Sequence, residues 1–193
     1  MLVCIASPSG GGKTTVCHKL LERHPDFEFS VSCTTRNPRH DETEGVDYHF
    51  LSREEFELRI RNGELAEYEE VHGHLYGTLK STVDDALSSG RVLLVDIDVK
   101  GALRLKSSYD GQCLTIFLQP PDLEVLKDRL RQRNTESEQE YETRLRRIEM
   151  ERTHGKQFDV EIINDSLEET VQEVEQEIQE TRTRLTEDMN YGS

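Results

Sequence analysis

The sequence contains no internal repeat, no low-complexity tract and no linker rich in proline or glycine that would separate two folding units. Its 193 residues suffice for one compact core with insertions, and a second domain of ordinary size would be a tight fit. Hydrophobic residues make up 34% of the chain and charged residues 33%, a balance that suits a small soluble protein with long polar helices. Apolar residues recur with clear periodicity, so the composition does not indicate disorder.

Basic residues are scarce, and the formal net charge is −15. Such a charge disfavours nucleic acid or an anionic membrane as partners. It does not exclude small phosphorylated ligands, because a local group of arginines can override the distant field. No apolar run approaches the length of a membrane span, and no charged-then-apolar leader precedes the first predicted strand.

The cysteines are few and scattered, and none forms a CxxC pair or a Cys/His metal spacing: Cys4, Cys17, Cys33 and Cys113. A zinc site is therefore not expected. Cys4 and Cys113 lie in predicted strands, where we expect them to be small core residues. The pattern suits a reducing compartment, and we expect a cytoplasmic protein of unknown oligomeric state.

The N-terminal segment has the layout of a phosphate-binding loop. An apolar strand-like run leads into a glycine cluster and a Lys-Thr pair at the start of a predicted helix: Ser7, Pro8, Ser9, Gly10, Gly11, Gly12, Lys13, Thr14 and Thr15. Glycines let backbone N–H groups converge on an anion, and a helix N-terminus adds partial positive charge. Lys13 can reach the terminal phosphates of a nucleoside triphosphate, and the Thr14 hydroxyl can bind Mg²⁺. The alternative is an ordinary glycine-rich turn, and the motif's first glycine is Ser7 here.

The first half of the chain then alternates helices and strands. The patterns predict a helix over residues 14–23, a strand over 27–32, a polar loop over 33–39, a short helix from 52 to 63 and short strands over 68–76. Residues 33–78 therefore form a small mixed α/β insertion.

The second half returns to a parallel-sheet pattern. Buried strands are predicted over residues 92–98 and 114–118, and a last short strand over 160–163. The final predicted helix carries the apolar stripe Leu167, Val171, Val174, Ile178 and Leu185. The expected fold is a doubly wound α/β sheet with ligands at the carboxyl ends of the strands. Asp96 and Asp98 follow one such strand. Asp96 is either a second-layer residue of the site or a simple strand-end acid.

Arg36 and Arg39 lie in the polar loop, with Tyr48 not far beyond. Guanidinium forks match phosphate oxygens, and a tyrosine hydroxyl adds a neutral donor, so these residues suit a second phosphate site. An exposed arginine pair that only decorates the surface is the alternative.

Five ordered blocks make the sequence similar to the guanylate kinase family: residues 7–14, 30–39, 45–50, 75–78 and 95–102. The resemblance covers essentially the whole chain. It implies a P-loop nucleoside monophosphate kinase fold with a parallel sheet core flanked by helices. The core comprises residues 1–32, 79–121 and 151–193, the mixed α/β insertion at 33–78 binds GMP, and a helical lid spans 122–150.

The resemblance implies transfer of the γ-phosphoryl group of ATP to GMP, and to dGMP, with Mg²⁺ as cofactor, in purine nucleotide metabolism. The implied GMP-binding residues are Ser32, Arg36, Arg39, Glu42, Tyr48, Glu67, Tyr76, Thr78 and Asp98. Arg36, Arg39, Tyr48 and Tyr76 would hold the GMP phosphate, with Glu42 organising their loop. The others would read guanine, whose N1–H and 2-amino group suit a carboxylate acceptor.

On the donor side the resemblance implies that residues 7–15, Arg129 and Arg133 bind ATP. Lys13, Arg36, Arg133 and Arg144 would surround the transferred group, and positioning and charge neutralisation would replace covalent chemistry. Asn134 stands where the family usually has glycine.

Two other functions remain open on the sequence alone. One is a non-catalytic scaffold module of the same fold, although such modules typically lose the phosphate loop or the GMP-reading residues. The other is a kinase of related fold acting on a phosphorylated sugar, against which the Ser32, Glu67 and Asp98 set argues.

Overall fold

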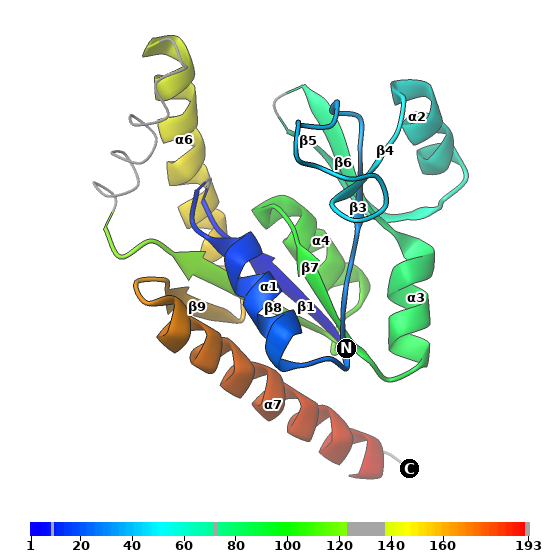
Figure 1. Ribbon diagram of the computed structural model, residues 1–193. Coiled ribbons are helices and arrows are strands. Elements are labelled where there is room, and N and C mark those ends of the chain that lie inside the picture. Colours follow the sequence, from blue (N-terminus) through cyan, green and yellow to red (C-terminus); the bar gives the residue numbers. More distant parts are fainter. Residues whose placement is uncertain (9, 72, 123–137, 192–193) are drawn as a thin grey trace.

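The computed structural model describes residues 1–8, 10–71, 73–122 and 138–191, without the side chains of 138–145, 147 and 188–191. Two sheets organise the described chain (Figure 1). A five-stranded parallel sheet has the order β2-β7-β1-β8-β9, and a four-stranded sheet has the order β4-β3-β6-β5. The parallel sheet and its flanking helices confirm the predicted α/β class.

The strands of the parallel sheet are β1 (Leu2–Ala6), β2 (Phe27–Phe29), β7 (Val92–Asp96), β8 (Cys113–Gln119) and β9 (Val160–Ile163). Every residue of β1 is buried, because the strand is central and covered on both faces. In register, Ile5 lies opposite Asp96 on β7 and opposite Ile116 on β8. The carboxyl ends of β1 and β7 therefore meet at one edge of the sheet.

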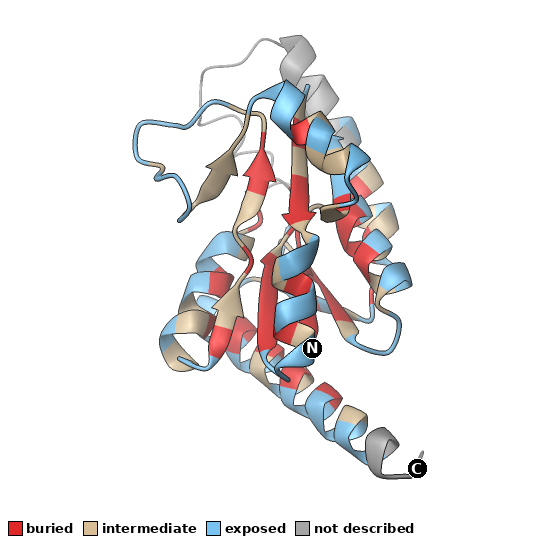
Figure 2. Ribbon diagram, turned by 90° about the vertical axis from the view of Figure 1, so that its right-hand side faces the viewer, coloured by how far each residue is buried: buried red, intermediate tan, exposed pale blue. Residues whose placement is uncertain are grey.

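Helices cover both faces of this sheet: α1 (Lys13–Arg23) and α7 (Leu167–Tyr191) on one side, α3 (Lys80–Ser88) and α4 (Val99–Ser108) on the other. Figure 2 shows the buried residues gathered on the strands and on the inner helix faces. On α7 the predicted stripe packs through Val171, Val174 and Ile178, whereas Leu167 is exposed. Cys4 is buried as expected, but Cys113 is only half-buried.

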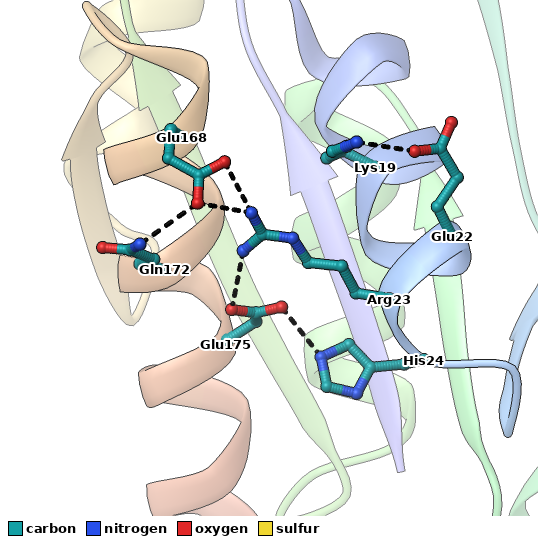
Figure 3. Close-up of polar contacts among 7 residues, drawn as sticks. All are labelled: Lys19, Glu22, Arg23, His24, Glu168, Gln172 and Glu175. Atoms are coloured by element: carbon teal, nitrogen blue, oxygen red, sulfur yellow. Dashed lines mark hydrogen bonds and ion pairs between the residues drawn. The ribbon is translucent and has the colours of Figure 1, made fainter.

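Ion pairs hold α7 against the end of α1 (Figure 3). Arg23 donates to Glu168 and, at 3.2 Å, to Glu175, and His24 pairs with Glu175 at 2.9 Å. His24 also stacks on Phe27, with ring centroids 4.5 Å apart. Since α1 starts at the phosphate loop, these contacts anchor its far end.

The second sheet consists of β3 (Ser32–Thr34), β4 (Tyr48–Phe50), β5 (Leu65–Val71) and β6 (His74–Leu79). It is mixed: β3 pairs with β4 in parallel and with β6 in antiparallel orientation. The helix α2 (Arg53–Arg61) begins with the predicted capping box, in which Ser52 and Glu55 satisfy each other's backbone N–H groups. Phe56 on α2 is fully buried beneath this sheet.

The sequence analysis was wrong at the ends of two predicted strands. The strand predicted over residues 27–32 is two strands of different sheets, β2 and β3, and the polar loop predicted from residue 33 begins only after Thr34. The strand predicted to run to Asp98 ends at Asp96, because the Asp98 carboxylate caps α4 by accepting from the Lys100 and Gly101 amides. The helix α6 (Glu138–Gly155) runs through residue 150, the expected end of the lid.

No helix in the part of the chain that the structure describes combines the length and apolarity that crossing a bilayer requires.

Candidate active site

The loop between β1 and α1 presents backbone N–H groups at the sheet edge. Gly10 and Gly12 adopt left-handed conformations with φ of 84° and 86°, which glycine reaches without steric cost. Gly12 is the N-cap of α1 and no side chain caps the helix. The first amides of α1 are therefore left to an anion, as in a phosphate-binding loop.

Ser7 occupies the position of the motif's first glycine, and its surroundings explain how it fits. Its side chain is buried and its hydroxyl donates to the Pro8 carbonyl at 3.1 Å. The Gly11 amide donates to the same carbonyl at 2.8 Å, which closes the turn. A Cβ on Gly11 would lie 2.7 Å from the Ser7 Cβ, so the serine is accommodated because residue 11 has no side chain.

Asp96, at the end of β7, contacts the side chains of both Lys13 and Thr14. Its carboxylate lies 3.4 Å from the Lys13 Nζ and accepts from the Thr14 hydroxyl at 2.5 Å. The nearby Asp96 charge raises the pKa of Lys13, against the opposing effect of burial, so the ammonium form is secured. The sequence left Asp96 open between two interpretations. The structure places it in direct contact with Lys13 and Thr14.

A second cluster gathers around Arg36, from the strands β4 and β6 and the loop after β3. Its guanidinium forms two bonds to Glu42, at 2.9 and 2.7 Å, and Nε donates to the Tyr76 hydroxyl at 3.3 Å. The Tyr48 ring lies against it, 5.4 Å from centroid to Cζ. The Glu42 bonds raise the pKa of Arg36, and the same bonds lower the pKa of Glu42. Both groups are therefore fixed in their charged forms.

Glu42 also organises the loop itself, since it accepts the backbone N–H of Arg39 at 2.8 Å. The Arg39 side chain is 73% exposed, and its nearest ionic contact is a long 3.9 Å approach to Glu42. The Arg36 guanidinium, by contrast, already donates four hydrogen bonds to the protein: one from Nε, two from Nη1 and one from Nη2. Of its five N–H groups, one is left to bind a ligand. Arg39 is therefore the more available of the two for a ligand.

Tyr48 connects this cluster to the phosphate loop. Burial raises the pKa of the Tyr48 hydroxyl, and the Asp96 charge raises it further while Lys13 opposes the shift. The charges at the loop thus act on a ring that touches Arg36.

A buried carboxylate lies on the second sheet. Glu67 on β5 is only 6% exposed and lies opposite Thr78 on β6, whose hydroxyl donates to it at 2.9 Å. Burial raises the pKa of Glu67 to about 7, although the Thr78 bond lowers it. The nearby charge of Asp98, the N-cap of α4, raises the pKa of Glu67 further. Ser32 lies half-buried on β3 of the same sheet.

One contact to the phosphate loop was missed from the sequence. Asn164, which follows β9, donates from Nδ2 to the Gly11 carbonyl at 2.7 Å and accepts from the Thr170 hydroxyl at 3.0 Å. A Cβ on Gly12 would collide with the same amide, at 2.7 Å. The available signal was an asparagine directly after a strand of the parallel sheet, at the edge where the loop lies.

Several expected site residues lie outside the described residues: Ser9, Arg129, Arg133 and Asn134. Arg144 lies on α6, and its side chain is likewise outside the description. In the described part of the chain, no three His, Cys, Asp or Glu side chains are grouped as a metal-ion cage would require.

Comparison with known proteins gives one consistent result. Residues 1–181 match the family model described as guanylate kinase. The chain is 48% identical to a guanylate kinase of Salinibacter ruber over 93% of this chain and 95% of the relative. It is 47% identical to that of Chlorobium luteolum over 89% of this chain and 87% of the relative. A crystal structure of guanylate kinase from Anaplasma phagocytophilum superposes with a TM-score of 0.81 at 32% identity, over 94% of this chain and 86% of that one. The chain belongs to the guanylate kinase family.

Proposed function

We propose that this protein transfers the γ-phosphoryl group of ATP to GMP, and to dGMP, giving ADP and the nucleoside diphosphate. The observation that carries the proposal is the buried Glu67 carboxylate paired with Thr78, on a sheet that also bears the arginine cluster. Guanine offers N1–H and the 2-amino group along one edge, and one carboxylate accepts from both. Membership of the guanylate kinase family supports the same assignment.

On the acceptor side, Arg36, Arg39, Tyr48 and Tyr76 bind the GMP phosphate, and Glu42 holds Arg36 in place. Glu67, Ser32, Thr78 and Asp98 read the base. The bidentate bonds between Arg36 and Glu42 support this division, because they fix the orientation of the guanidinium before a ligand arrives.

On the donor side, residues 7–15 cradle the ATP phosphates through backbone N–H groups, and Lys13 neutralises charge on the transferred group. Arg129, Arg133 and Arg144 are assigned to the ATP side and the lid from the family resemblance alone. Closure of the region around residues 122–150 would exclude water, which otherwise would compete with GMP for the phosphoryl group.

Mg²⁺ would be held by Thr14 with the ATP phosphates, and Asp96 would orient that hydroxyl. The oxygen donors fit this ion, since Mg²⁺ prefers carboxylate, hydroxyl and phosphate ligands. When bound, the ion supplies charge neutralisation of the β- and γ-phosphates. The protein's own part is to hold Lys13 and Thr14 through Asp96 and to present the GMP phosphate, which needs no general base because it is already an anion.

The scaffold-module and sugar-kinase alternatives are less well supported, because the phosphate loop and the guanine-reading set are both intact. We further propose that the enzyme acts in purine nucleotide metabolism in the cytoplasm, in keeping with its four free cysteines.

The test is a coupled assay of ADP formation with GMP, dGMP, IMP and AMP as acceptors, on the wild type and Glu67→Gln. GMP should be used best, IMP less well because it lacks the 2-amino group, and AMP worst by roughly 10⁴-fold or more because its N1 is an acceptor. Glu67→Gln should bring the kcat/KM values for GMP and AMP closer together. An unchanged ratio would remove Glu67 as the base reader, and no turnover with GMP would favour the scaffold module.

A further inference from the structure

Two cations on α4 pair with the same carboxylate on β5, and one of them also forms a hydrogen bond to the β5 backbone. Lys100 and Arg104, four residues apart on α4, both pair with Glu69, Lys100 at 3.6 Å. Arg104 also donates from Nη1 to the Tyr68 backbone carbonyl at 2.5 Å. Since Tyr68 directly follows Glu67, Arg104 holds the strand at the residue next to the buried carboxylate.

The start of α4 lies directly against Glu67. A Cβ on Gly101 would lie 2.7 Å from the Glu67 Oε2 and 2.8 Å from the Ile97 Cδ1, so residue 101 has no room for a side chain. The distance between α4 and β5 therefore decides where the Glu67 carboxylate lies. The Arg104 bonds set that distance one turn further along the helix.

Several groups influence the ionisation of Glu67. Asp98 on α4 disfavours its ionised form and Arg104 on the same helix favours it, while the Thr78 hydroxyl on β6 donates to it. The Cys4 thiol on β1 is also near enough to be influenced by the Glu67 charge. Arg104 is thus the cation that offsets the effects of Asp98 and of burial.

We propose that Arg104 is a positioning residue for recognition of the acceptor base, which holds β5 against α4 so that the Glu67 carboxylate stays in place. The inference rests on the proposed role of Glu67 in reading guanine. The side-chain bonds of Arg104 go to Tyr68 and Glu69, which are not among the residues proposed to bind the base or the phosphates. Arg104 acts on Glu67 in two ways: its bonds to the Tyr68 carbonyl and the Glu69 carboxylate hold the strand, and its positive charge favours the ionised form of Glu67.

The experiment compares Arg104→Ala with Lys100→Ala, a matched control that removes a cation from the same Glu69 but no bond to the Tyr68 carbonyl. KM for GMP, KM for ATP and kcat are measured from pH 6 to pH 9. If loss of Arg104 raises the pKa of Glu67 by about one unit, about a tenth rather than half of the carboxylate is ionised at pH 7. KM for GMP should then rise about fivefold at pH 7 and return close to the wild-type value at pH 9, with KM for ATP unchanged.

Lys100→Ala should stay within about twofold of the wild type at every pH. Arg104→Lys should recover the pH profile in part, because it restores the charge but not the two-pronged fork. It also serves as the test variant if Arg104→Ala does not fold, since a displaced pH profile relative to Lys100→Ala is expected there too.

Identical pH profiles for the Arg104 and Lys100 variants would overturn the inference and leave the proposed function standing. The Glu67→Gln variant in the same series tests the proposed function separately. If it keeps the wild-type ratio of GMP to IMP use, Glu67 does not read guanine, and both the base assignment and the role of Arg104 fall.

Discussion

Replacing Glu67 with glutamine should make the ligand-free protein more stable at neutral pH while it damages GMP use. The carboxylate is only 6% exposed, and burial raises its pKa from 4.5 to about 7. Glutamine has nearly the same shape, keeps an oxygen that can accept from Thr78 and carries no charge. The substitution therefore removes the cost of burying an ionised group and leaves most of the packing intact.

The magnitude follows from linkage between protonation and folding. At about 1.4 kcal/mol per pKa unit, the raised pKa corresponds to about 3 kcal/mol lost from the folded state when the group is fully ionised. Between pH 4.5 and 7 the folded protein keeps a proton that the unfolded chain has released, so stability falls as pH rises through this window. The loss of folding free energy caused by ionised Glu67 is complete at pH 8 and largely absent at pH 5. Because the new amide N–H groups need partners, we expect a net gain of about 1–3 kcal/mol at pH 8.

The assay is urea unfolding of wild type and Glu67→Gln without nucleotides, at pH 5 and pH 8. The gain from the substitution should be present at pH 8 and nearly absent at pH 5. Glu70→Gln is the control, because Glu70 lies on the same strand with a side chain that is 53% exposed. It should show no such pH dependence. A variant that is less stable than wild type at pH 8, or a gain equal at both pH values, would refute the reasoning.

Four other substitutions test separate parts of the molecule. Lys13→Ala should lower kcat by at least about 10²-fold with GMP affinity retained in calorimetry, and near-normal turnover would contradict its role at the transferred group. Arg133→Ala or Arg144→Ala should reduce turnover far more than GMP binding, whereas an equal loss of GMP affinity would place that arginine at the acceptor site. Arg23→Ala removes two ion pairs to α7 and should lower the free energy of unfolding only slightly, with both KM values unchanged. An altered KM for ATP would show that α7 docking also shapes the phosphate loop.

Local sequence signals predicted those elements whose determinants lie close together in the chain. The capping box before α2, the glycine-rich turn between β1 and α1, and the strands β1, β8 and β9 all match their patterns. The helices α3 and α4 were not predicted. The first has no side-chain N-cap, and the cap of the second, Asp98, was interpreted only as a ligand-binding residue. An aspartate after a strand has the same sequence pattern whether it caps the next helix or binds a ligand, so the pattern does not distinguish the two roles.

The break between β2 and β3 could not be predicted from alternation alone. Residues 27–34 keep an extended pattern throughout, yet Ser30 donates its amide to Leu94 of the parallel sheet and Ser32 pairs with Tyr48 of the other. Which sheet a strand joins depends on partners about 60 and 16 residues away along the chain.

The sequence by itself determined the glycine-rich loop and the family resemblance, because each depends on residue type and order along the chain. The residues proposed for the base and the phosphates follow from that resemblance. Tertiary structure alone decided the roles of Asp96, Asn164 and Arg104. Each of these side chains acts through a neighbour that is distant in sequence: Asp96 on Lys13 and Thr14, Asn164 on the Gly11 carbonyl, and Arg104 on the Tyr68 carbonyl. The pKa of Glu67 likewise follows from burial by α4 and β6, because desolvation depends on what the fold places around a carboxylate and not on the residues beside it.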